Sequence, residues 1–186
     1  MSNLPRRKFL QQTALATAGL SLSGSLLANP ISIFSANDTI NFGVIGCKGM
    51  GWANIQAHLK LPNINCIALA DIDQRVLDER TAQIKEISGK APKQYKDYRK
   101  MLENKDIDAV IIGTPDHWHC LNMVDALQAD KHVYVEKPLA NSIEECNVML
   151  DAGRKYNKMV QVGQWQRSGK HYDDAIKYVQ SGELGQ

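Results

Sequence analysis

The sequence predicts an α/β fold with a doubly wound parallel sheet, and three observations support that prediction. Five short runs rich in Val and Ile have the length and composition of strands buried on both faces. Segments with helical periodicity lie between these runs, so strand and helix alternate along the chain. A glycine-rich turn, Gly46–Gly51, directly follows the first run. Because strand–helix–strand crossovers are right-handed, this order builds an open parallel sheet with helices on both faces.

Each element follows from its local sequence. The Ser-x-x-Glu pattern of Ser142–Glu145 is a capping box, which predicts that a helix begins there. Gly89 and Asn157 are suited to end helices. The predicted strands are Ile40–Ile45, Ile64–Ala70, Ala109–Ile112, His132–Val135 and Met159–Val162. The predicted helices are about Gly51–Leu61, Gln74–Ser88, Tyr98–Glu103, His117–Ala129, Ser142–Tyr156 and His171–Gln180.

The glycine turn is typical of the first strand–turn–helix unit of a Rossmann domain. There, backbone amides and a helix N-terminus meet where a pyrophosphate can bind. The G-x-G-x-x-G fingerprint asks for glycine at positions 46, 48 and 51, but position 48 is Lys and Gly49 stands one place late. The charge of Lys48 could assist pyrophosphate binding, or its side chain could point to solvent. The sequence leaves both alternatives open.

Asp71 ends the second predicted strand, 20 residues after Gly51. A dinucleotide fold places at this point the carboxylate that accepts hydrogen bonds from the adenosine ribose hydroxyls. Such a carboxylate repels a 2′-phosphate, so it favours NAD over NADP. The alternative is that Asp71 caps the next helix, a role that Asp73 could fill instead.

Two polar segments follow successive strands. Thr114–His119 reads T-P-D-H-W-H and comes after the third predicted strand, and Glu136–Pro138 reads E-K-P and comes after the fourth. Both lie at the carboxyl edge of a parallel sheet, where ligands bind in open α/β folds. We therefore expect the two segments to converge on one functional crevice.

The first 36 residues have the composition of a leader. Arg6, Arg7 and Lys8 are followed by Phe9-Leu10 and by a weakly apolar segment, 13–27, that is too short and polar to be a permanent membrane span. This string resembles the twin-arginine export signal, although Pro5 and Gln11 depart from its core pattern. We expect export to the periplasm through the twin-arginine translocase, with cleavage after Ala28 or Ala36. The alternative is an unstructured basic tail.

Charge and cysteine usage exclude several classes of function. The formal net charge is +2, but three of the basic residues lie in the leader, so the remainder is slightly acidic. A nucleic-acid-binding surface needs a concentrated basic patch, so we expect no nucleic-acid partner. The four cysteines have no C-x-x-C spacing, which argues against a zinc or redox motif, and we expect none of them to be functional. The sequence leaves open whether two of the cysteines form a disulfide. The cysteines are Cys47, Cys66, Cys120 and Cys146.

The glycine turn, Asp71, T-P-D-H-W-H and E-K-P together resemble the Gfo/Idh/MocA oxidoreductases from about Ile40 to Gln186. The resemblance implies a Rossmann domain that binds NAD, with NADP as the alternative, and hydride transfer at a hydroxyl-bearing carbon of a sugar or polyol. It makes Lys137 the catalytic residue, in contact with the reacting hydroxyl. The cofactor-binding residues that it implies are Gly46, Lys48, Gly49, Met50, Gly51, Asp71, Thr114, Pro115, His117, Glu136, Gln164 and Arg167.

The resemblance also suggests how the chain is organised. We expect a leader over residues 1–36, the NAD(P)-binding Rossmann domain over 37–165, and over 166–186 the start of a truncated C-terminal catalytic domain. The chain alone should then turn over substrate poorly. Two other functions stay open: an NAD-dependent glycosidase of the same family, and a non-catalytic nucleotide-binding module. The sequence does not decide whether the protein forms a homo-oligomer, and no metal site is expected.

Overall fold

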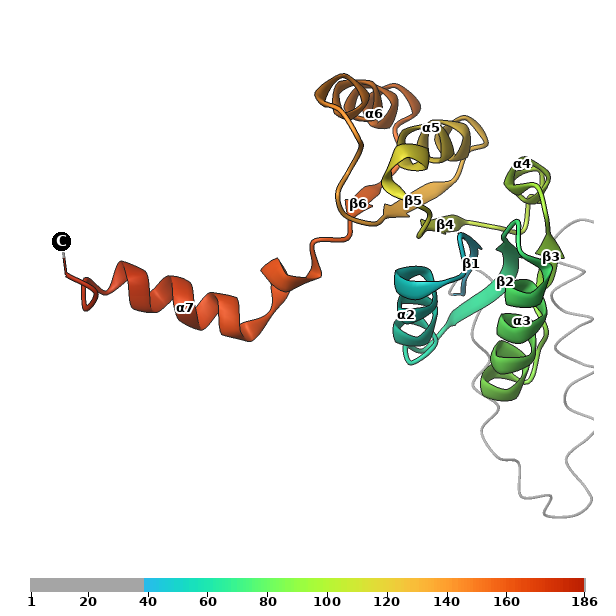
Figure 1. The fold of residues 1–186 in the computed structure, drawn as a ribbon, viewed down its shortest axis with the longest axis horizontal. Helices are drawn as coiled ribbons and strands as arrows, with labels where there is room; N and C mark the ends of the chain where they lie inside the picture. Colours follow the sequence, from blue (N-terminus) through green and yellow to red (C-terminus); the bar gives the residue numbers. More distant parts are fainter. Residues whose placement is uncertain (1–38, 186) are drawn as a thin grey trace, which may run out of the picture. The chain divides into compact units, whose positions relative to one another are not determined.

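A computed structural model describes residues 39–185 and confirms the α/β fold with a doubly wound parallel sheet (Figure 1). Six strands form one sheet in the order β3-β2-β1-β4-β5-β6, and every pair of neighbours is parallel. The leader predicted over residues 1–36 lies outside the described residues. The strands are β1 (Ile40–Ile45), β2 (Ile64–Ala70), β3 (Lys93–Tyr95), β4 (Ala109–Ile112), β5 (His132–Val135) and β6 (Val160–Val162).

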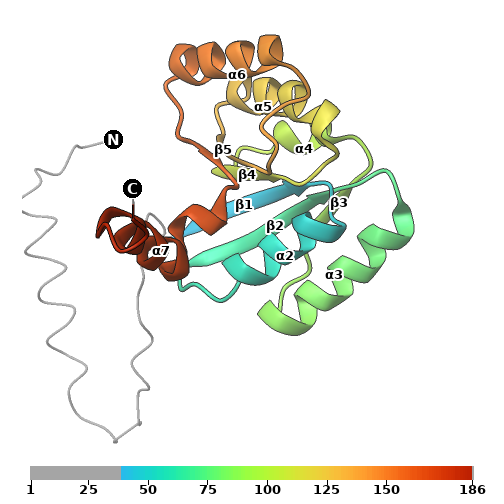
Figure 2. The ribbon, with the colours of Figure 1, turned by 60° about the vertical axis from the view of Figure 1, so that its left-hand side comes forward.

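Helices cover both faces of the sheet, as Figure 2 shows. The apolar side chains accordingly form two buried clusters, one per face. One cluster packs β1 and β2 against α2 and α3, and the other packs the sheet against α4, α5 and α6. The helices are α2 (Gly49–His58), α3 (Gln74–Ser88), α4 (Tyr98–Leu102), α5 (His119–Gln128), α6 (Ile143–Tyr156) and α7 (Lys170–Gln180). Two 3-10 turns, Asp116–Trp118 and Trp165–Ser168, precede α5 and α7.

The predicted strands are confirmed almost residue for residue, with one omission. Strand β6 begins at Val160, one residue later than expected, and β3 was not predicted. Strand β3 is only three residues long, and its Lys-Gln-Tyr sequence carries no apolar run. It pairs at the edge of the sheet with the end of β2, where one partly buried residue, Tyr95, packs against the core.

The predicted capping signals at Ser142, Gly89 and Asn157 are confirmed, whereas α2 ends at His58, three residues before the predicted Leu61, and α5 begins at His119, two residues after the predicted His117. Ser142 Oγ accepts a hydrogen bond from the Glu145 amide at 3.2 Å, and the Glu145 carboxylate accepts one from the Asn141 amide at 3.0 Å. Gly89 and Asn157 end their helices in the left-handed conformation, with φ of 76° and 51°. Helix α2 begins at Gly49, two residues earlier than predicted, so the glycine turn leads straight into it.

Helix α7 buries none of its residues within the described part of the chain. Its apolar side chains are exposed, among them Tyr172, Ile176 and Val179. No helix between residues 39 and 185 is long and apolar enough to cross a bilayer.

Candidate cofactor site

The residues that follow the strands stand in a row at the carboxyl edge of the sheet. The amide of Gly46 donates to Ala70 O at 2.9 Å, that of Gly113 to Ile45 O at 2.8 Å, and that of Glu136 to Ile112 O at 3.0 Å. These bonds continue the strand pairing by one residue. The sheet therefore fixes the glycine turn and the polar segments after β4 and β5 beside one another.

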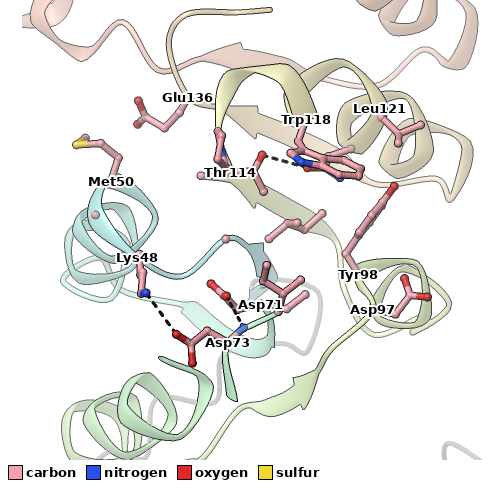
Figure 3. A pocket seen from close by; sticks show the side chains of 18 of the residues that line it. Lys48, Met50, Asp71, Asp73, Asp97, Tyr98, Thr114, Trp118, Leu121 and Glu136 are labelled. Carbon is pink, nitrogen blue, oxygen red and sulfur yellow. Dashed lines mark hydrogen bonds and ion pairs between the residues drawn. The ribbon is translucent and has the colours of Figure 1, made fainter. Parts of the chain in front are cut away.

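A cleft of about 1000 Å³ opens above this row, and we call it the edge cleft (Figure 3). It brings together most of the residues predicted to bind a cofactor and the predicted catalytic lysine. Those that line it are Gly46, Lys48, Gly49, Met50, Asp71, Thr114, Pro115, Glu136 and Lys137. Such a concave site with a few convergent polar groups is the usual form of a small-molecule site.

Gly46 and Gly113 line the floor of the cleft, and Gly51 lies directly behind them in backbone contact with both. Gly46 has φ of +83°, and a Cβ there would lie 2.8 Å from the Thr114 amide nitrogen. A Cβ on Gly51 would overlap the Gly46 carbonyl oxygen, and one on Gly113 would lie 2.6 Å from the Gly51 Cα. Gly51 is thus the residue that lets α2 approach the strands, as the last glycine of the fingerprint does. The sequence analysis did not single out Gly113. Its position directly between a predicted strand and Thr114 was the signal that could have identified it.

Lys48 takes the place of the middle fingerprint glycine without backbone strain. Its φ of −93° and ψ of 171° are extended, so the turn does not require glycine there. No side chain caps the start of α2 at Lys48, and the first turn of the helix has no acidic residue. Uncapped amides at a helix N-terminus attract anions. This part of the cleft therefore fits a pyrophosphate.

Asp71 is bound to the glycine turn. Its Oδ2 accepts a hydrogen bond from the Cys47 amide at 2.8 Å, and its Oδ1 accepts one from the Asp73 amide at 3.0 Å. Each carboxylate oxygen can accept a second hydrogen bond, which leaves room for two ribose hydroxyls. The cap of α3 is Asp73, whose Oδ1 accepts from the Arg75 amide at 3.0 Å. The capping alternative for Asp71 is therefore excluded.

The Lys48 side chain, which sequence reasoning left undecided, pairs with Asp73. Lys48 Nζ lies 3.4 Å from Asp73 Oδ2, and the lysine side chain is 66% exposed. The Arg75 guanidinium binds the same carboxylate and, with smaller contributions from the Arg75 amide and Lys48, lowers the pKa of Asp73 to about 2. Asp73 is thus ionised at neutral pH.

Glu136 is held rigidly at the opposite end of the cleft. It is 3% exposed, and its Oε1 accepts a hydrogen bond from Asn54 Nδ2 of α2 at 2.8 Å. Its Oε2 accepts from the Lys137 amide at 3.2 Å. Lys137 itself is exposed and lines the cleft, so its amine is available to a ligand.

His119 joins the two polar segments. It is 1% exposed, and its Nδ1 and Nε2 lie 2.8 Å from the carbonyl oxygens of Pro138 and Thr114, respectively. A second bond in this region runs from Thr114 Oγ1 to Asn122 Oδ1 at 3.1 Å. Sequence reasoning gave His119 no role, because nothing in T-P-D-H-W-H distinguishes the buried histidine from the exposed one.

Four of the predicted residues do not line the edge cleft. His117 is exposed, and its Nδ1 lies 3.7 Å from Asp116 Oδ1. Gln164 and Arg167 are exposed in the segment between β6 and α7. Gly51 lies behind the floor, against Gly46. The ligand contacts assigned to these residues stay predictions.

The cysteines and the acidic residues supply no second centre in the part of the chain that the structure describes. All four cysteines are free thiols, and burial raises the pKa of the Cys47 and Cys66 thiols. Both therefore stay protonated at neutral pH. No group of His, Cys, Asp or Glu between residues 39 and 185 is arranged to hold a metal ion.

The strand order, the glycine turn and the carboxylate at the end of β2 define the NAD-binding Rossmann class. Residues 40–164 match the model of the Gfo/Idh/MocA proteins, described as an oxidoreductase family with an NAD-binding Rossmann fold. The chain belongs to this family.

Similar proteins extend well beyond the length of this chain. A "Glycosyl hydrolase family 109 protein" from Shewanella sp. (strain W3-18-1) is 28% identical over 205 residues, which cover 100% of this chain and 45% of the relative. The scyllo-inositol dehydrogenase of Lactobacillus casei, solved with NAD(H) and scyllo-inositol, is 26% identical with a TM-score of 0.70. That match covers 79% of this chain and 42% of the dehydrogenase chain. An NAD-binding oxidoreductase from Klebsiella pneumoniae is 30% identical with a TM-score of 0.67, and the match covers 79% and 40% of the two chains. The chain thus spans less than half the length of these proteins.

Proposed function

We propose that this chain forms the NAD-binding part of an oxidoreductase that transfers a hydride between a sugar or polyol carbon and the cofactor. The observation that carries the proposal is the edge cleft, which joins the glycine turn, Asp71 and Lys137 in one continuous site. The inositol dehydrogenase neighbour, solved with NAD(H) and a polyol, supports this choice of ligands.

The geometry suggests a role for each end of the cleft. The α2 N-terminus would bind the pyrophosphate, and Asp71 would accept hydrogen bonds from the ribose hydroxyls. The nicotinamide would then lie towards Thr114 and Glu136. Bound NAD supplies the hydride acceptor. Lys137 would hold the substrate hydroxyl and take its proton, as a lysine amine in a charged site can do.

The predictions outside the cleft belong to the same proposal. The twin-arginine pattern of the leader supports export of the folded protein to the periplasm. Residues 166–186 would begin the domain that completes the substrate site. We propose in addition that Gln164 and Arg167 contact cofactor or substrate once that domain is present.

Calorimetric titration of the full chain with NAD and with NADP tests the cofactor assignment. We expect tighter binding of NAD, and we expect Asp71→Ala to weaken NAD binding more than NADP binding. Loss of a charged hydrogen-bond acceptor typically costs about 1.5–3 kcal/mol. Asp106→Ala is the matched control, because Asp106 is an exposed aspartate just before β4, at the other edge of the sheet. Equal losses for both nucleotides would contradict the ribose role of Asp71.

The names of the curated relatives favour a second candidate, an NAD-dependent glycosidase. In that reaction the hydride that is removed returns within the same cycle, so no net NADH forms. The two candidates therefore differ in stoichiometry. An oxidoreductase accumulates NADH when incubated with NAD and a polyol, which absorbance at the nicotinamide band measures. A glycosidase releases nitrophenol from a nitrophenyl sugar without a lasting change in that band.

A further inference from the structure

Two cations and two carboxylates meet at the end of the edge cleft where β2 stops. Asp73 Oδ2 is 3.1 Å from Arg75 Nη2 and 3.4 Å from Lys48 Nζ, and Arg75 Nε donates to Asp73 Oδ1 at 3.2 Å. Figure 3 shows Lys48 reaching across to Asp73. One carboxylate thus binds both cations.

Asp73 is also part of the carboxylate pair at the ribose position. Its amide donates to Asp71 Oδ1 at 3.0 Å, and Figure 3 shows the two side chains next to each other. Asp71, Ile72 and Asp73 all line the cleft. A nucleotide ribose held by Asp71 would therefore have Asp73 and its two cations as neighbours.

The difference between NAD and NADP lies at this point. NADP carries a phosphate on the 2′ oxygen of the adenosine ribose, and free lysine and arginine side chains are the usual partners of such a group. Lys48 and Arg75 have long side chains that are 66% and 91% exposed, so both could reach a phosphate once they were released. Asp73 engages both and adds a second negative charge beside Asp71.

We propose that Asp73 is a cofactor-specificity residue: by binding Lys48 and Arg75 it denies both cations to a 2′-phosphate and so selects NAD over NADP. The inference rests on the proposed binding of NAD in the edge cleft. The low pKa of Asp73 agrees with it, because the carboxylate stays charged over the whole physiological range. Asp71 alone would repel the phosphate, whereas Asp73 also removes the groups that would attract it.

The chain contains a matched control for this residue. Asp97 caps α4 just as Asp73 caps α3, and it accepts from the Arg99 amide at 3.0 Å and from Arg99 Nε at 2.9 Å. Asp97 also lines the edge cleft. It differs in two respects: within residues 39–185 no lysine pairs with it, and its amide makes no bond to the Asp71 carboxylate.

The test is calorimetric titration of the full chain, as wild type, Asp73→Asn and Asp97→Asn, with NAD and with NADP. Asparagine preserves the helix cap, so both variants should fold, and urea unfolding checks this. We expect Asp73→Asn to raise the affinity for NADP relative to NAD about tenfold, through two released cations and one lost like charge. We expect Asp97→Asn to leave that ratio within about twofold, because Asp97, unlike Asp73, makes no bond to Asp71 at the proposed ribose position.

A further variant identifies the cation responsible. Adding Arg75→Ala to Asp73→Asn should reverse most of the gain in NADP affinity. An unchanged NADP-to-NAD ratio in Asp73→Asn, or an equal rise in Asp97→Asn, would overturn the inference while NAD binding itself stands. Wild-type protein that binds neither nucleotide would overturn the proposed function, and this inference with it.

Discussion

The two sides of the edge cleft are built in opposite ways. The glycine-turn side is a contact between backbones, in which Gly46, Gly51 and Gly113 leave no room for a Cβ. The side made by the segments after β4 and β5 depends on buried polar side chains, chiefly His119 and Glu136. The first side is disrupted when a substitution adds a Cβ, whereas the second is disrupted when a substitution removes a hydrogen-bond partner.

The largest effect is expected from Gly51→Ala. The added Cβ would overlap the Gly46 carbonyl oxygen, so α2 would have to move away from the strands. Because the obstacle is backbone and not a flexible side chain, we expect a loss of about 2–4 kcal/mol in the free energy of unfolding. NAD affinity should fall with it, since the α2 N-terminus is displaced. Urea unfolding and calorimetric titration measure the two quantities.

Gly49→Ala is the control for that substitution. Gly49 has φ of +45°, but a Cβ there would meet no atom within 4 Å. Its cost is therefore the backbone strain alone, about 1–2 kcal/mol. Equal unfolding midpoints for Gly51→Ala and the wild type would show that the backbone contact is not needed.

The sequence predicted the backbone side of the cleft better than the polar side. The strands, the glycine turn and Asp71 follow from local pattern, because burial on both faces and a positive φ restrict the residue types. Gly113 was not predicted, because the residues it contacts, Gly46 and Gly51, are distant in sequence. Strand β3 was not predicted because this short edge strand has no apolar run.

The polar side could not be predicted in the same detail. The motif T-P-D-H-W-H shows two histidines, and only the packing of α5 decides that His119 is buried while His117 faces solvent. Likewise, the partner of Glu136 is Asn54, a residue of α2 that lies 82 positions away. Hydrogen bonds over such separations depend on the assembled sheet and leave no local signal.

His119→Leu tests the polar side and should have the smaller of the two effects. Leucine keeps most of the buried volume but cannot donate to the carbonyl oxygens of Thr114 and Pro138, which now face His119 at 2.8 Å. A neutral imidazole carries one N–H, so at least one of these partly buried carbonyls loses its donor, at a cost of about 0.5–1.5 kcal/mol in the free energy of unfolding. Amide hydrogen exchange should also become faster in the segments after β4 and β5, because His119 is the side chain that joins them.

His117→Leu is the control, since an exposed substitution in the same motif should change stability by about 0.5 kcal/mol or less. If urea unfolding gave both variants the same stability, His119 would be only a space-filling residue, and the polar side would have to be held by the Glu136–Asn54 bond instead.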